Sequence, residues 1–355
     1  MLVELGYNFQ LRKDDIKAKK YYEQALDKIR KNPSEVYGIG ATFERKVLID
    51  YALQAYDIAI KLDSKLNFNF QMALLYGQKG DTGMMIEKLL VESQNNHQDL
   101  IGIQNQLSRF MTEDPEASFN ESLRKALLIR TQKTQDIFWN QYLSWFYVQQ
   151  KEYGKAFIQE KAIYKRNPET FSNIVNLAQL SIQEGEQDTA KEILNFVLEN
   201  TIDSDLQIKA HYFLTEMKIK NAHEADYKSI ETELEQLIKQ FGITPYSLSL
   251  QILQAHFVTF NLKKPEQGKA ILKKALELPL NQYQTADVKM ELADILLYEE
   301  KFNQALLYYS QIEEDLKNDV IGHDASLKAA KTSYFKADFV WALKQFKELK
   351  SATSQ

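Results

Sequence analysis

The five histidines are the side chains of this sequence best suited to bind a metal ion or to carry a proton. They are His97, His211, His223, His256 and His323. No two of them are four residues apart, and none belongs to a His-Glu-x-x-His motif, so no helix offers a pair of zinc ligands. The chain has no cysteine, which excludes thiolate catalysis and Cys-ligated zinc. We therefore predict no metal site and no cofactor, and we expect His256 to be a buried or half-buried side chain of a helix interface.

Two glycine clusters invite comparison with phosphate-binding loops. Gly38 and Gly40 open a partial dinucleotide fingerprint, but a third glycine and a preceding strand are both missing. Gly77, Gly80 and Gly83 are not followed by the Lys-Ser/Thr pair of a P-loop. We interpret the first cluster as part of a helix and the second as a turn between two helices.

Paired acids could serve in general acid–base chemistry, and Glu299-Glu300 and Glu313-Glu314 are such pairs. Both pairs fall at helix ends or on polar helix faces, where carboxylates are ordinarily solvated. No nucleophile, base and orienting group can be assembled from the sequence. We predict no catalytic residues and a protein that is not an enzyme. A deep polar pocket with perturbed acids in residues 205–242 would support the opposite interpretation.

The composition indicates long helices. Only 12 glycines and 6 prolines occur in 355 residues, of which 44% are hydrophobic. We expect all six prolines to lie between helices, where the missing N–H costs nothing. A net charge of −5 argues against a nucleic-acid partner, and no apolar run approaches the roughly 18 residues of a membrane span.

Seven positions recur after 34 residues near the start of the chain. Leu2, Leu5, Gly6, Phe9, Ala18, Tyr22 and Ala25 are matched by Val36, Ile39, Gly40, Phe43, Ala52, Tyr56 and Ala59. Spacings of three and four place each set on one helix face. The pattern resembles the consensus of the tetratricopeptide repeat (TPR), which implies pairs of antiparallel helices, A and B. We expect the small residue of helix A to admit the aromatic ring of helix B.

The same pattern continues, with interruptions, along most of the chain. Regular repeats occupy 2–66, 136–201 and 246–350, and degenerate helix pairs occupy 68–93, 98–130 and 205–242. We predict an all-α fold for residues 1–355, a single right-handed superhelical solenoid of about ten TPR-like antiparallel helix hairpins. Its stability should come from contacts between neighbouring hairpins.

The resemblance also implies where a partner would bind, because helix A lines the concave groove of such solenoids. Transferring the groove positions to this sequence gives the predicted partner-binding residues: Tyr7, Tyr37, Phe138, Gln141, Trp145, Gln179 and Tyr298. The stretch 138–147 holds six aromatic residues, and exposed aromatics commonly anchor interfaces. The clamp that binds acidic chaperone tails has an asparagine after the helix A glycine, but Tyr7 and Ala41 stand there.

These features predict a non-enzymatic scaffold that binds a protein or peptide segment in its concave groove. The composition resembles that of Bacteroidota TPR proteins, which favours a cell-envelope or secretion assembly, and the periplasm over the cytoplasm. The alternative is a solenoid that binds a glycan or another nonprotein ligand through exposed aromatics. Phe346 and Leu349 leave an apolar face on the last helix, from which we expect further chain or self-association.

Overall fold

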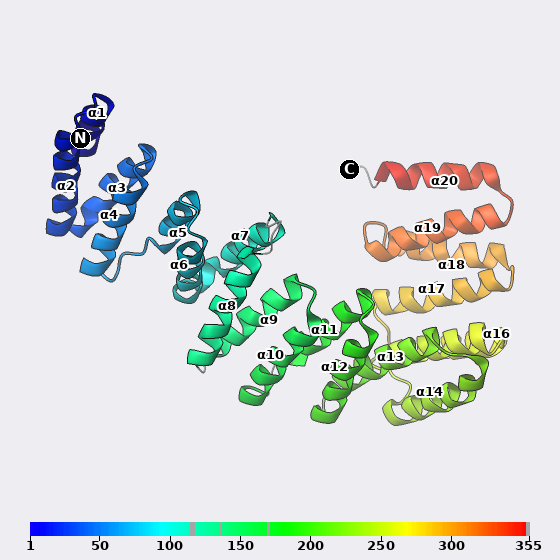
Figure 1. Ribbon diagram of the computed structural model, residues 1–355. Helices are drawn as coiled ribbons and strands as arrows, with labels where there is room; N and C mark the ends of the chain where they lie inside the picture. Colours follow the sequence, from blue (N-terminus) through cyan, green and yellow to red (C-terminus); the bar gives the residue numbers. More distant parts are fainter. Residues whose placement is uncertain (114–117, 135, 169–170, 353–355) are drawn as a thin grey trace. The chain divides into compact units, whose positions relative to one another are not determined.

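The computed structural model describes residues 1–113, 118–134, 136–168 and 171–352, and every regular element in these ranges is a helix. The helices follow one another as antiparallel pairs (Figure 1). The first helix of each pair, A, has an odd number and the second, B, an even number. The chain divides into two compact units, Met1–Asn167 and Pro168–Gln355, which are described separately.

Unit 1 contains five helix pairs. They are α1 (Leu2–Leu11) with α2 (Asp15–Lys31), α3 (Val36–Arg45) with α4 (Ile49–Leu62), α5 (Asn69–Gln78) with α6 (Thr82–Asn95), α7 (Leu100–Glu113) with α8 (Ser118–Lys133), and α9 (Ile137–Gln149) with α10 (Tyr153–Arg166). Short 3₁₀ turns, η1 (Pro33–Glu35) and η2 (His97–Asp99), precede α3 and α7. The stretches 68–93 and 98–130 fall on the pairs α5–α6 and α7–α8.

Unit 2 also contains five pairs. They are α11 (Phe171–Gln183) with α12 (Gln187–Asn200), α13 (Ser204–Lys220) with α14 (Tyr227–Phe241), α15 (Leu248–His256) with α16 (Pro265–Ala275), α17 (Gln282–Tyr298) with α18 (Phe302–Asp315), and α19 (Val320–Phe335) with α20 (Phe339–Ala352). A 3₁₀ turn, η3 (Glu224–Asp226), precedes α14, and a π-helical segment, η4 (Phe257–Asn261), extends α15. Twenty α-helices in the described ranges confirm the prediction of about ten hairpins.

One backbone motif closes helix A in most pairs. The turn contains a residue with positive φ, and the N–H that follows it bonds to a carbonyl five residues back, as in Asp14 to Phe9 (3.0 Å) and Leu48 to Phe43 (2.9 Å). This is the Schellman motif, which satisfies the last carbonyls of a helix. The positive-φ residues at the helix A turns are Lys13, Val47, Gly80, Lys151, Gly185, Lys263, Glu300 and Ala337; after Lys263 the bond reaches back six residues. Of the three glycines predicted to form a turn, only Gly80 lies between two helices. Gly77 belongs to α5 and Gly83 to α6, so the prediction was wrong for these two.

The pairs close over the predicted contact between a small residue and an aromatic ring. A Cβ added to Gly40 would lie 2.8 Å from the ring of Tyr56, and one added to Gly6 would meet Tyr22 in the same way. Both tyrosines are almost fully buried. Glycine is therefore needed in helix A because the ring of helix B occupies the space of a side chain.

The described prolines avoid helix interiors, with one departure from the prediction. Pro265 is the first residue of α16 and does not lie between helices. The first helical position tolerates proline because its N–H would have no helical partner. Pro115 lies outside the described residues. No helix in the described ranges is long and apolar enough to span a membrane.

Candidate partner-binding groove

Unit 2 carries a hollow of about 530 Å³, walled by the A helices α13, α15, α17 and α19. We call it the unit 2 groove. Its apolar surface comes from Leu248, Ile252 and Met290, and Tyr212 and Tyr246 add aromatic rings. Tyr246 is 75% exposed. The groove therefore combines apolar contact area with accessible aromatic edges.

A row of polar side chains, three of them acids, lines the groove along α17. Gln284, Asp287, Glu291 and Asp294 follow one another at intervals of three or four residues, so they share one helix face. The opposite face of α17 is buried, through Leu292 and other apolar side chains. This amphipathic pattern turns the carboxylates toward the hollow.

Asp294 is fixed by two partners. It accepts a hydrogen bond from the Tyr309 hydroxyl of α18 (2.5 Å), and its other oxygen lies 2.6 Å from Nζ of Lys328 on α19. Burial, reinforced by the nearby Asp294 carboxylate, raises the pKa of Tyr309 well above its ordinary value, so the hydroxyl remains a donor. The carboxylate is thereby held in one position before any ligand arrives.

Unit 1 repeats this arrangement. Tyr22 of α2 donates to the Gln10 side chain (2.6 Å), and Tyr56 of α4 donates to Glu44 (2.5 Å). In each case the ring of the helix B tyrosine packs against a glycine of helix A, and its hydroxyl donates a hydrogen bond to a polar side chain of the same helix A. The repeat thus fixes polar side chains on the A helices as well as packing the core.

His256 lies at the edge of the unit 2 groove, bonded to Glu291 (Nδ1 to Oε1, 2.9 Å). The hydrogen bond that His256 donates to Glu291 is the main cause that raises the pKa of His256, while burial opposes it. The His256 side chain is 47% exposed, which is more than expected for a side chain in a helix interface. The preceding residue, Ala255, is the one that is fully buried.

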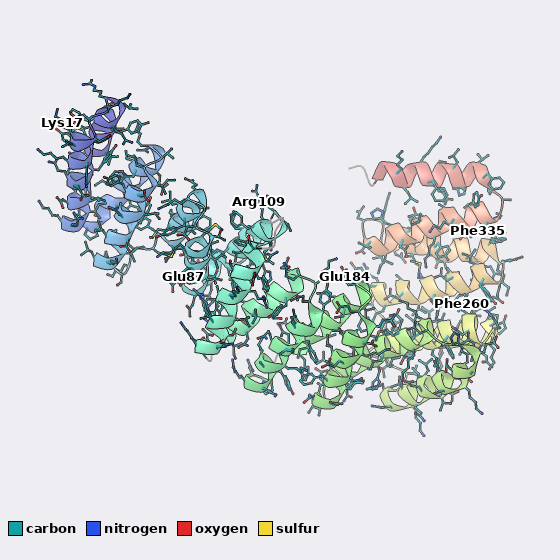
Figure 2. All side chains as sticks on the ribbon, in the orientation of Figure 1. Lys17, Glu87, Arg109, Glu184, Phe260 and Phe335 are labelled. Carbon is teal, nitrogen blue, oxygen red and sulfur yellow. The ribbon has the colours of Figure 1, made fainter. Side chains whose placement is uncertain are left out.

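The π-helical segment η4 accounts for the exposure of His256 beside a buried Ala255. The Lys264 N–H bonds to the Val258 carbonyl (3.0 Å), one residue further back than in the other turns. The extra residue rotates the end of helix A, which packs Thr259 against Gly268 and leaves Phe260 half-buried. Phe260 then lies between His256 and Tyr298, at centroid distances of 4.6 and 5.3 Å (Figure 2 labels Phe260). Segments of this kind often occur at functional sites.

The groove carries more negative than positive charge. Burial raises the pKa of Asp287, which has no cationic partner among the described residues. Glu216 of α13 adds a fourth carboxylate next to Tyr212. Burial, with help from these acids, raises the pKa of Tyr212 to about 12, so it stays neutral. Three carboxylates therefore line the groove beside one lysine, and Glu216 and His256 contact its lining residues Tyr212 and Glu291.

The predicted partner-binding residues are distributed over both units, and none lines the unit 2 groove. In unit 1, Tyr37 is 61% exposed with its ring against Phe68 (5.2 Å). Tyr7 is half-buried under Nζ of Lys46 (5.0 Å). In unit 2, Gln179 is exposed, and Tyr298 continues the groove face of α17 one turn beyond Asp294.

The aromatic helix α9 is mainly a core element. Its rings at 139, 142, 146 and 147 are buried, whereas Phe138 and Trp145 are half-buried and Gln141 is exposed. Phe138 contacts His97, and Trp145 contacts Tyr142 edge-on (5.3 Å). The helix therefore offers parts of two rings to a ligand and not a broad platform.

A second hollow, of about 690 Å³, lies in unit 1 beside α1 and α3. Lys28, Glu35 and Arg45 contribute mixed charges to it. It involves fewer A helices than the unit 2 groove and contains no continuous row of like side chains. No cluster of three or more potential metal ligands occurs in the part of the chain that the structure describes.

No protein-family model matches this sequence, and no curated protein matches it. Solved structures of other helical-repeat proteins do match. A tetratricopeptide repeat protein from Parabacteroides merdae is 16% identical, with 72% of this chain and 95% of that chain covered and a TM-score of 0.38. Yeast Tom70 is 14% identical, with 98% and 90% covered and a TM-score of 0.38. Pseudomonas aeruginosa PilF is 18% identical, with 61% and 91% covered and a TM-score of 0.40.

The chain has a tetratricopeptide-repeat architecture. This architecture is shown by the consecutive antiparallel helix pairs and by the recurring contact between Gly6 or Gly40 and the tyrosine of helix B. The TPR resemblance inferred from the 34-residue pattern is thereby confirmed at the level of the fold.

Proposed function

We propose that this protein is a non-enzymatic interaction scaffold that binds a polypeptide segment in the unit 2 groove. The observation that carries the proposal is the groove itself, a hollow walled by four consecutive A helices and lined by apolar, aromatic and prearranged polar side chains. Sites of this composition suit a ligand that buries apolar surface and is oriented by a few polar contacts.

The groove has the length of a short extended peptide. Helices that pack together lie 8–10 Å apart, so four A helices span roughly 25–30 Å. An extended chain advances about 3.3–3.6 Å per residue, so about eight residues would cross the groove. The side chain of Tyr298 at the end of α17 is proposed as an additional contact because it is exposed. Tyr37, also exposed, is proposed as a separate contact site of unit 1.

A catalytic role gains no support from the groove chemistry. His256 hydrogen-bonds to Glu291, but no described serine or threonine hydroxyl is bonded to this imidazole. A histidine–carboxylate pair without a nucleophile lacks the constellation that covalent catalysis requires. The glycan alternative requires exposed rings for stacking, and α9 buries four of its six.

Selection from a displayed library of random peptides tests the proposal. Ser249, which lines the groove, is replaced by tryptophan to fill the hollow, and Ser229, exposed on α14, receives the same change as a control. We expect the parent protein and Ser229→Trp to enrich related sequences and Ser249→Trp to lose them. Equal enrichment by all three proteins would contradict binding in the groove.

A further inference from the structure

We propose that the unit 2 groove recognises a segment that carries lysine or arginine side chains. This inference rests on the proposed function, since it names the chemistry of the polypeptide that the groove would hold. It is drawn from the charges, the apolar surface and the rings that meet in this hollow.

The charges of the groove are only partly compensated. Asp294 is paired with Lys328, and Glu291 with His256. Asp287 forms no ion pair with a described cation, whereas Glu216 accepts a hydrogen bond from Tyr212 and also acts on His256. A bound lysine or arginine would supply the missing positive charge, and charge-assisted hydrogen bonds of this kind are about twice as strong as neutral ones.

Asp287 is the carboxylate that would gain most from a bound positive charge. Its carboxylate is accessible, yet the surrounding groove removes enough water to raise its pKa. A charge that has lost water without gaining a partner favours any ligand that brings the opposite charge. The same desolvation disfavours an acidic segment, which would add like charges beside Asp287 and Glu291.

The remaining groove surface fits the rest of a basic side chain. Leu248, Ile252 and Met290 can cover the methylene groups of lysine or arginine, which bury readily while the charged head stays polar. Tyr212 and the exposed Tyr246 offer ring faces that attract cations. Carboxylates beside apolar and aromatic surface thus match both parts of such a side chain.

Fluorescence anisotropy with a defined probe tests the inference on the full chain. The probe is a fluorescein-labelled peptide of about ten residues in which alanine alternates with lysine or arginine, slightly longer than the roughly eight residues that would cross the groove. Two reference peptides replace every basic residue by glutamine or by glutamate. The groove variant is Asp287→Asn/Glu291→Gln.

A matched variant controls for the net charge of −5. Glu277→Gln/Glu314→Gln removes two exposed carboxylates of unit 2 that do not line the groove. Both double variants raise the net charge equally, so non-specific attraction of the probe falls equally in both. Circular dichroism melts of the variants confirm that each is folded.

We expect the basic probe to bind the parent protein, and the groove variant to weaken binding at least about tenfold, a change of roughly 1.4 kcal/mol. The matched variant should weaken it less than about twofold. Equal losses in both variants would overturn the inference, because attraction would then follow net charge alone. Preferential binding of the glutamine peptide, abolished by Ser249→Trp, would overturn the basic chemistry while leaving the scaffold intact. No binding of any peptide would overturn both proposals.

Discussion

At the scale of the residue, six residues other than glycine adopt left-handed backbone conformations at the helix A turns. Val47 is the least suited of them, because a β-branched side chain at φ 56° is sterically crowded. Its side chain is 71% exposed, so little packing depends on it. The Schellman bonds of these turns therefore form at a cost that the sequence does not minimise.

We expect Val47→Gly to stabilise the protein by about 1 kcal/mol, because glycine adopts this conformation without a Cβ clash. Gly80→Ala, at φ 76° in the corresponding turn of α5 and α6, should destabilise it by a similar amount. Urea denaturation measures both. Equal signs for the two substitutions would show that backbone conformation does not control these turns.

The pair of His256 and Glu291 should make stability depend on pH. Hydrogen bonding to Glu291 raises the folded-state pKa of His256 above its ordinary value near 6.5, with Asp294 and Glu216 adding to the effect. The stabilisation is therefore complete below about pH 6.5 and is lost as the pH rises through the raised pKa.

We expect His256→Gln to lower the free energy of unfolding at about pH 6 and to change it much less at about pH 9. Urea denaturation at both values measures the difference. The matched control is His323→Gln, at an exposed histidine with no carboxylate partner among the described residues. A loss for His256→Gln that does not change with pH would contradict the charged pair.

At this scale the sequence predicts some contacts and not others. The 34-residue repeat is enough to pair Gly40 with Tyr56, because both belong to the repeated pattern. It does not reveal the exposure of His256, since the π-helical turn that rotates it depends on how Thr259 packs against Gly268. The spacing of the acids at 287, 291 and 294 shows in the sequence that they share one face of α17. That they line a groove can be seen only when the positions of the neighbouring A helices are known.

At the scale of the element, the helix pair is closed by a ring that fills the place of a side chain. Gly38 and Gly40 lie two residues apart on α3 and show the difference. A Cβ on Gly38 would meet nothing within 4 Å, whereas one on Gly40 would lie 2.8 Å from the Tyr56 ring. The two glycines therefore have different reasons to be present.

We expect Gly38→Ala to stabilise the protein by up to about 1 kcal/mol through helix propensity. Gly40→Ala should destabilise it, because overpacking costs about 1–3 kcal/mol and exceeds that gain. Urea denaturation of the two variants gives the comparison. Stabilisation by Gly40→Ala would mean that the Tyr56 ring can move away at no cost and that the pair is not closed as described.

Helix pairs were predictable from the sequence even where the repeat is degenerate. Residues 68–93, 98–130 and 205–242 fold as pairs because apolar spacing and turn residues persist after the consensus side chains have changed. The start of α16 at Pro265 was not predicted, since a proline is equally compatible with a loop and with a first helical turn.

At the scale of the whole molecule, the repeated packing of helix pairs stabilises the fold, and side chains that differ between repeats line the proposed groove. Each helix pair buries its apolar face against its neighbours, and the buried cluster of unit 1 runs without interruption from Val3 to Leu75. The groove of unit 2 appears where α13, α15, α17 and α19 carry a local excess of carboxylates. The predicted residues Tyr7, Tyr37, Phe138, Gln141, Trp145, Gln179 and Tyr298 came from repeat positions alone, which carry no information on that excess.

The most direct test of binding in the unit 2 groove is to map where a peptide contacts the chain. The basic probe, with one alanine replaced by the photoreactive benzoylphenylalanine, is cross-linked to the full-length protein, and the attachment sites are read by mass spectrometry. We expect cross-links in α13, α15, α17 and α19, around Tyr212, Ile252 and Met290, and their loss in Ser249→Trp. Cross-links confined to unit 1 or to the B helices of unit 2 would contradict binding in the unit 2 groove.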